Sequence, residues 1–173
     1  MALFSNKQEA NLRSCIRMIE DALASLGHPP DDSRTESADD MPAWRVETRG
    51  GAKVDVHLGV EADKNILRVT ATVAAAPKTD GHGLFRKLLE LNASVVKGVA
   101  FGILDDNIVL LNERSIMDLD PSEVEDILRR TEGEANHYAQ ILATDVELPV
   151  AQAQPSPAPP PAAKSQAKSP AKS

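Results

Sequence analysis

Four histidines and a single cysteine are the side chains of this chain best suited to metal binding or nucleophilic chemistry. The histidines stand at positions 28, 57, 82 and 137, and none has a second ligand at the spacing of a zinc site. Cys15 lies near the apolar stripe of a predicted helix, so we expect it to pack as a small hydrophobic side chain. One cysteine also excludes an intramolecular disulfide and a cysteine-cluster metal site.

Carboxylates gather in two places, and neither has the pattern of a reactive site. The loop 28–43 is acidic, but its spacing does not match the alternating ligands and central glycine of an EF-hand. Asp105 and Asp106 precede Asn107 at a predicted tight turn, where these residue types are common for backbone reasons. The segment 80–83 contains two glycines but lacks the lysine of a phosphate-binding loop. We therefore predict no catalytic, cofactor-binding or metal-binding residues, and a protein that is not an enzyme.

The charge of the chain is unevenly distributed. The 173 residues carry a net charge of −7, and residues 151–173 contribute +3 through three lysines, so the first 150 residues carry −10. An acidic body disfavours a domain that binds duplex nucleic acid, because such a domain needs a basic face. The N-terminus lacks the pattern of a secretory signal, and no apolar run approaches the ~20 residues of a membrane span. We expect a cytoplasmic protein.

Hydrophobic periodicity predicts an α+β domain. Apolar residues at helical spacing indicate helices over residues 5–26, 84–91 and 120–143, and the last begins with a strong capping sequence at Asp120. Strict alternation predicts strands over 44–48, 54–60 and 67–73, with one buried and one wet face, as in an antiparallel meander. Further strands are expected over 95–104 and 108–112. The expected order is helix, three-stranded meander, helix, β-hairpin, helix.

The second helix and the hairpin contain more apolar residues than one buried face requires. The hairpin is apolar on both faces, and the helix is apolar on two sides. A second chain or another element must cover the additional face, so these side chains are either ordinary core or a contact for a partner. The residues predicted to form a partner or dimer surface, by strand addition or groove packing, are Leu84, Phe85, Leu88, Phe101, Val109 and Leu111.

The C-terminal region differs in composition from the rest of the chain. We predict a folded domain over 1–145 and a disordered tail over 146–173 that is rich in proline, alanine, lysine and serine. A flexible tether is one interpretation of this tail. Its three lysines provide only a weak attraction for nucleic acid or another anionic polymer, and Pro157 and Pro160 have the spacing of a proline-rich docking site.

Several segments together resemble the YbjN family. They are "LLELN", the strand pair "VAFGILDDNIVLL" with its acidic turn, "ERSIMDLDPSEVEDIL" and "ANHYAQIL". The layout matches over residues 5–143, and most specifically over 88–142. The YbjN family is similar in fold to the type III secretion chaperones of the Tir-chaperone class, and both are bacterial.

The resemblance implies a non-enzymatic α+β protein without a cofactor. Secretion chaperones form homodimers and hold a stretch of an effector protein against apolar patches. A homodimeric, chaperone-like or regulatory protein with a polypeptide partner or client is therefore expected. The alternative is a signalling or regulatory adaptor whose basic, proline-rich tail recruits a partner or an anionic polymer.

Overall fold

The computed structural model describes residues 2–37, 41–61 and 64–143. The helices are α1 (Ala2–Ser25), α2 (Pro30–Ser33), α3 (His82–Ser94) and α4 (Pro121–Ala143). The strands are β1 (Arg34–Thr35), β2 (Ala43–Glu47), β3 (Lys53–Glu61), β4 (Lys64–Ala75), β5 (Ala100–Leu104) and β6 (Asn107–Ser115). The predicted tail 146–173 and the domain boundary before it lie outside the described residues.

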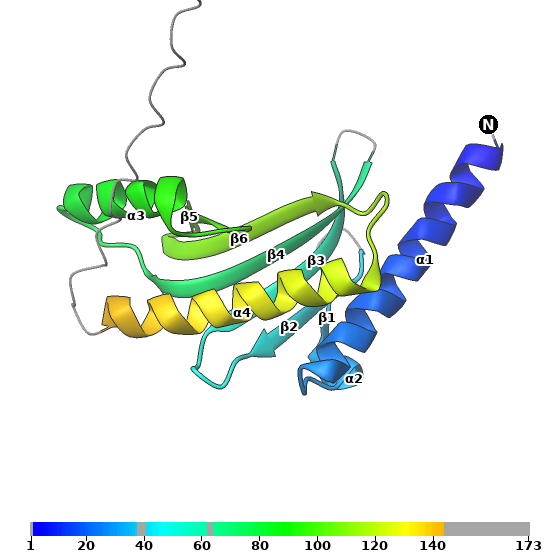
Figure 1. Cartoon of the computed structure of the whole chain (residues 1–173), viewed down its shortest axis with the longest axis horizontal. Helices are drawn as coiled ribbons and strands as arrows, with labels where there is room; N and C mark the ends of the chain where they lie inside the picture. The colour runs from blue at the N-terminus through cyan, green and yellow to red at the C-terminus, as the bar shows by residue number, and fades with distance from the viewer. Residues whose placement is uncertain (1, 38–40, 62–63, 144–173) are drawn as a thin grey trace, which may run out of the picture.

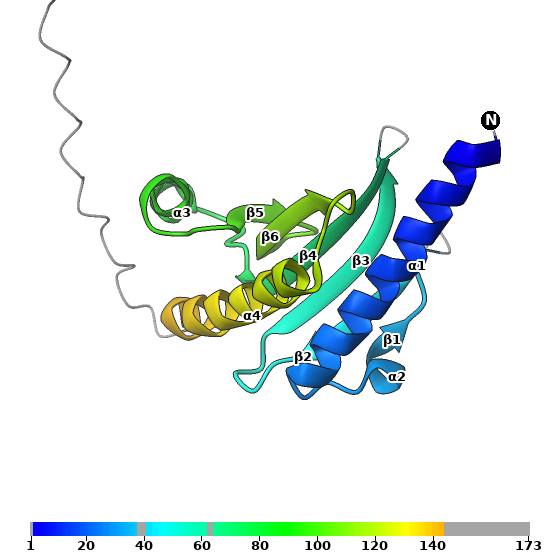
Figure 2. The same cartoon turned by 45° about the vertical axis from the view of Figure 1, so that its right-hand side comes forward.

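The described strands form a single antiparallel sheet in the order β1-β2-β3-β4-β6-β5. Strands β2, β3 and β4 pair in sequence, which confirms the predicted meander, and the β5–β6 hairpin joins the meander through β6. Helices α1 and α4 lie on one face of the sheet, whereas α3 lies near the β5 edge (Figures 1 and 2). Strand β5 and helix α3 therefore end the sheet on one side.

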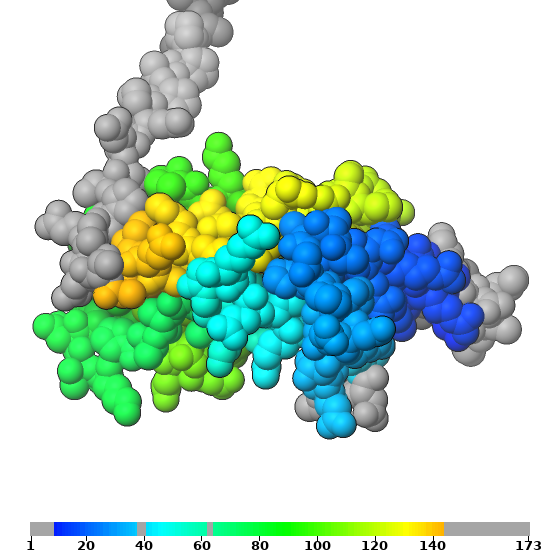
Figure 3. Space-filling view, turned by 90° about the horizontal axis from the view of Figure 1, so that it is seen from below, coloured from blue at the N-terminus to red at the C-terminus, as the bar shows by residue number. Residues whose placement is uncertain are grey.

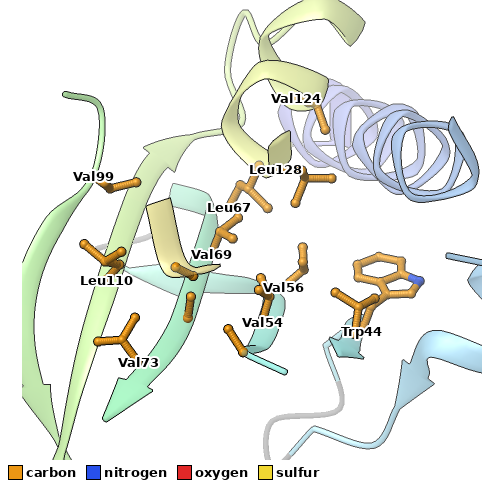
Figure 4. Close-up of a cluster of buried hydrophobic side chains, with 14 of the residues drawn as sticks. Trp44, Val54, Val56, Leu67, Val69, Val73, Val99, Leu110, Val124 and Leu128 are labelled. Carbon is orange, nitrogen blue, oxygen red and sulfur yellow. The ribbon is translucent and has the colours of Figure 1, made fainter. Parts of the chain in front are cut away.

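Alternation along β3 and β4 builds the core under α1 and α4. Val56, Leu67 and Val69 point toward the helices and are fully buried, whereas Lys53 and Arg68 point to the opposite face and are exposed. Leu128 of α4 lies above Leu67 in Figure 4. The sheet thus buries one face, as the sequence pattern predicted.

The start of α4 matches its predicted capping sequence. The Glu123 N–H donates to Asp120 Oδ1 at 2.9 Å, and the Ser122 hydroxyl donates to the same oxygen at 2.6 Å. These bonds favour the charged carboxylate, so they hold the pKa of Asp120 below its usual value. Because the N-terminal amides of a helix have no partner within the helix, this cap fixes where α4 begins.

The main differences between the structure and the sequence-based elements lie in three places, besides shifts of a few residues at other element ends. Helix α1 begins at Ala2, so the start predicted at residue 5 is too late. The loop expected over 28–43 contains the short helix α2 and the short edge strand β1. The strand expected over 95–104 begins only at Ala100, because α3 continues to Ser94 and the chain then turns at Gly98, whose φ is +73°. Val96 and Val99 are nevertheless buried, which explains why this connection has the pattern of a strand.

A hydrogen bond and a close contact hold the β2–β3 hairpin against α4. Thr48, before the turn, donates its hydroxyl to Asn136 Oδ1 on α4 in a short hydrogen bond. Gly50 lies so close that a Cβ there would stand 2.3 Å from the same oxygen. Figure 3 shows this hairpin in cyan packed against the yellow and orange atoms of α4. The contact holds α4 in place over the central strands.

A candidate protein-binding surface

Helix α3 is attached to the edge of the sheet by one side chain. Asn92 accepts the Phe101 N–H on Oδ1 at 2.7 Å and donates from Nδ2 to the Phe101 carbonyl at 3.2 Å. An edge strand presents outward main-chain groups at every second residue. Asn92 therefore occupies the outward groups of Phe101, and the next residue of β5 with outward groups is Ile103. This part of the edge is closed to a further strand.

Close packing at Gly81 fixes the beginning of α3. The Phe85 N–H donates to the Gly81 carbonyl at 2.9 Å, and the Phe85 ring lies across the glycine. A Cβ at position 81 would stand 2.6 Å from that ring and 2.8 Å from Pro77. Only glycine permits this approach, which holds the Phe85 ring against the loop before the helix.

The inner side of this region belongs to the core. Phe101 packs edge-on against Tyr138 of α4, with ring centroids 4.8 Å apart and planes at 80°. Burial raises the pKa of the Tyr138 hydroxyl, with a smaller contribution from the Glu134 carboxylate. Leu88 and Leu91 of α3 are buried in the same cluster. The end of α4 thus joins β5 and α3 into one packed unit.

The outer side of the same region is apolar and exposed. Leu89 on α3 is 67% exposed, Ile103 on β5 is 56% exposed, and Leu104, the next residue of β5 and on the opposite face of the strand, is 52% exposed. A shallow hollow of about 560 Å³ runs along α3 beside Leu89, lined by Phe85, Ala93 and neighbouring polar residues. We call Leu89, Ile103 and Leu104 the apolar end of the sheet. Large apolar side chains left in water at one place typically mark a site of contact with another polypeptide.

The six residues predicted for a partner surface divide into two groups. Leu88 and Phe101 are buried in the core cluster, and Val109 is buried on the opposite face of the sheet. The half-buried residues are Leu84, Phe85 and Leu111. The structure brings all six to α3 and the β5–β6 hairpin. Whether a partner contacts them stays a prediction.

The sequence reasoning did not select the three exposed residues. Leu84, Leu88 and Leu91 recur at the four- and three-residue spacing of one helical face, which leaves Leu89 about 100° away from that face. That spacing was sufficient to identify Leu89 as an outward residue. Ile103 lies on the same face of the sheet as Phe101, and its exposure depends on which elements pack around it, which no local pattern reveals.

The groups suited to metal binding or catalysis are dispersed over the described part of the chain. Within it, no three His, Cys, Asp or Glu side chains are grouped so that they would hold a metal ion. His57 Nε2 forms a hydrogen bond with the Ser37 hydroxyl at 3.0 Å, and His28 Nε2 lies 3.2 Å from Glu132 Oε1. Cys15 is buried, and burial raises its pKa to about 11, which makes the thiol a poor nucleophile at neutral pH.

Asp105 and Asp106 form the turn that the sequence predicted. Both lie in the left-handed region, with φ of 47° and 61°, as a two-residue hairpin turn requires. The Ala76 N–H donates to the Asp106 carbonyl at 2.8 Å, so the turn also holds the end of β4.

In the described ranges, no helix has the length and apolar character to cross a bilayer. What the apolar end of the sheet offers to another molecule is contact with the exposed side chains of Leu89, Ile103 and Leu104.

No protein-family model matches the chain, and no curated protein matches it in sequence. Solved structures are similar to it in fold. A chain in the ExsC–ExsE complex has a TM-score of 0.56 at 17% identity and covers 75% of this chain and 94% of its own. A chain in the heterodimeric ExoU–SpcU complex from the type III secretion system of Pseudomonas aeruginosa has a TM-score of 0.50 at 17% identity, with 70% and 95% covered.

YbjN from E. coli is also similar, with a TM-score of 0.45, 16% identity, and 78% and 95% of the two chains covered. The sequence comparisons do not place this chain in the YbjN family. At these identities the likenesses concern the fold. The predicted fold class is confirmed: the chain is an α+β protein with an antiparallel sheet, similar in fold to the type III secretion chaperones.

Proposed function

We propose that this protein is a non-enzymatic, chaperone-like or regulatory protein that binds a partner polypeptide and forms a homodimer through the apolar end of the sheet. The proposal keeps the cytoplasmic location expected from the sequence. The observation that carries it is the exposure of Leu89, Ile103 and Leu104 at the end of an otherwise well-packed domain. Burying three such side chains stabilises a complex by roughly 1.5–3 kcal/mol each before the costs of association.

The geometry at the edge favours side-chain packing over strand addition. Asn92 already fills the outward main-chain groups of Phe101, so a partner strand would have to displace it. Leu89 lies on a helix, and a second copy of α3 offers the same apolar surface to it. A two-fold contact of this kind is self-complementary, which is the usual form of a homodimer interface.

The similar structures support a role in binding another protein. Two of the similar structures, with TM-scores of 0.56 and 0.50, are complexes, ExsC with ExsE and ExoU with SpcU. A chain of this fold is therefore found in contact with a different polypeptide. We extend that role to this chain, with the apolar end and the adjoining Leu84, Phe85 and Leu111 as the contact surface.

Light scattering of the full chain tests the proposal. We expect twice the 18.6 kDa mass of the chain for the wild type. The double variant Leu89→Asp with Leu104→Asp should have the monomer mass, because two carboxylates in the contact oppose association. Met117→Asp is the matched control, since Met117 is 58% exposed but lies in the loop before α4.

Circular dichroism must show that all three proteins are folded. A monomeric wild type at every accessible concentration would refute the homodimer. A double variant that remains dimeric would place the contact elsewhere on the molecule.

A further inference from the structure

Helix α4 ends near an apolar side chain of β5, Ile103, that remains exposed. Tyr138 packs on Phe101, which is 8% exposed, and α4 ends five residues later at Ala143. Five helical residues advance ~7.5 Å, close to the ~6.8 Å between Phe101 and Ile103 along a strand. Ile103 shares the face of Phe101 but is 56% exposed. The helix therefore ends about level with the first side chain that it leaves uncovered.

The end of α4 and helix α3 lie on the same side of the molecule. Figures 1 and 2 both show the orange end of α4 beneath α3 and beside the β5–β6 hairpin. Figure 3 shows orange atoms of α4 next to green atoms of the α3 region. The C-terminal end of α4 therefore lies on the side of the molecule that carries α3 and the β5–β6 hairpin.

The sequence directly after α4 is suited to cover an apolar surface. Val146, Leu148 and Val150 alternate with Glu147 and Pro149. Side chains two residues apart lie on one face of an extended chain, and a residue before proline favours the extended conformation. Farther along, residues 151–173 contain alanine as their only apolar residue besides proline. The three large apolar side chains are thus concentrated within seven residues of Ala143.

We propose that residues 146–150 bind in extended form, within the same chain, over Ile103 and the adjoining outer side of α3 at Leu89. Seven residues after Ala143 span up to ~23 Å when extended, which gives them reach across the end of the sheet. Pro149 has no N–H to donate, so the contact is made by the alternate apolar side chains rather than by a full strand pairing.

This inference rests on the proposed function, because the segment occupies the surface that the partner needs. The segment must leave before a second chain binds, so it weakens association without blocking it. If it covers the surface half to nine-tenths of the time, the apparent dissociation constant rises about two- to tenfold. Residues 146–150 would then regulate access to the surface rather than serve as an inert tether.

Methyl NMR of the full chain, with isoleucine δ1-methyls labelled, tests the docking directly at concentrations where the chain is monomeric. The Ile103 signal is assigned with Ile103→Val. Leu148→Asp should shift the Ile103 signal, and the matched Gln152→Asp should leave it unchanged, as should the buried Ile19 in both variants. Nuclear Overhauser contacts from Ile103 to residues 146–150 are expected in the wild type. An Ile103 signal that Leu148→Asp does not alter overturns the inference.

Light scattering on the same samples separates this inference from the proposed function. A shifted Ile103 signal with a monomer at every concentration supports the docking and refutes the homodimer. A dimer with an unaltered Ile103 signal supports the homodimer and refutes the docking. If the contacts to Ile103 arise only between labelled and unlabelled copies in a mixed dimer, the segment binds the other chain, and the intramolecular inference is wrong.

Discussion

The centre of the sheet and its β5 end bury the same kind of side chain to very different extents. On the central strands, Val56 and Leu67 are fully buried beneath α1 and α4. At the β5 end, Ile103 lies on the same face of the sheet and is more than half exposed. These residues share one face of the sheet, and the difference is whether a helix covers that face above them. Alternation in a strand thus specifies which face is apolar, and the lengths of the helices decide how much of that face is covered.

The largest difference in stability between the centre of the sheet and its β5 end should appear when the same leucine-to-alanine change is made in each region. Leu67→Ala removes a fully buried side chain under α4 and should lower the free energy of unfolding by about 2–5 kcal/mol, since it leaves a cavity. Leu89→Ala, on the exposed side of α3, should change it by no more than about 0.5 kcal/mol. Urea denaturation of the two variants measures both. Equal losses would mean that Leu89 is covered in solution.

Asn92→Ala tests what attaches the exposed end to the rest of the sheet. The change leaves the N–H and carbonyl of Phe101 without their partner, so we expect a loss of about 1–3 kcal/mol. Hydrogen exchange of the Phe101 amide should accelerate more than that of amides in β3. Glu90→Ala is the control, because it removes only an exposed ion pair with Arg86. If both variants exchange alike at Phe101, Asn92 does not close the edge.

The free energy of unfolding should also depend on pH through Cys15, which lies on α1 in the core cluster. Burial raises the pKa of this thiol from 9.0 to about 11, so the folded state retains the proton that the unfolded state loses. The contribution to stability is complete below pH 9 and is lost as the pH rises through 11. Urea midpoints between pH 8 and pH 10.5 should fall more steeply for the wild type than for Cys15→Ala. Parallel slopes would show that the thiol is accessible to water.

The smallest expected effect concerns the N-terminal cap of α4, the helix that covers the centre of the sheet. The pKa of Asp120 is held low by the Ser122 and Glu123 bonds, so the charged cap stabilises the fold above the unfolded-state pKa and is lost as the pH falls through the lower folded value. Asp120→Ala should lower the urea midpoint at pH 7, and Asp120→Asn should largely retain it. The difference between wild type and Asp120→Ala should vanish at strongly acidic pH; a constant difference would argue against the charged cap.

Much of the fold could be predicted because its signals are local. The meander follows from alternation, the α4 start from Asp120 and Glu123, and the β5–β6 turn from two aspartates that tolerate positive φ. The connection after α3 was misassigned because buried Val96 and Val99 imitate a strand while Gly98 turns the chain. The exposed residues Leu89, Ile103 and Leu104 lie in the helix and hairpin that the sequence singled out, but the sequence reasoning did not select them, since exposure depends on neighbours far along the chain.

The sequence by itself determined the order and type of the main elements, the buried face of the meander and the acidic character of the body, because propensity, periodicity and charge are properties of neighbouring residues. Only the tertiary structure decided that Asn92 closes the β5 edge, that Phe101 meets Tyr138, and that Leu89, Ile103 and Leu104 remain in water. These features join α3, β5 and α4 across 9 to 37 residues of chain. They depend on where each helix ends in space, and packing between distant segments sets that.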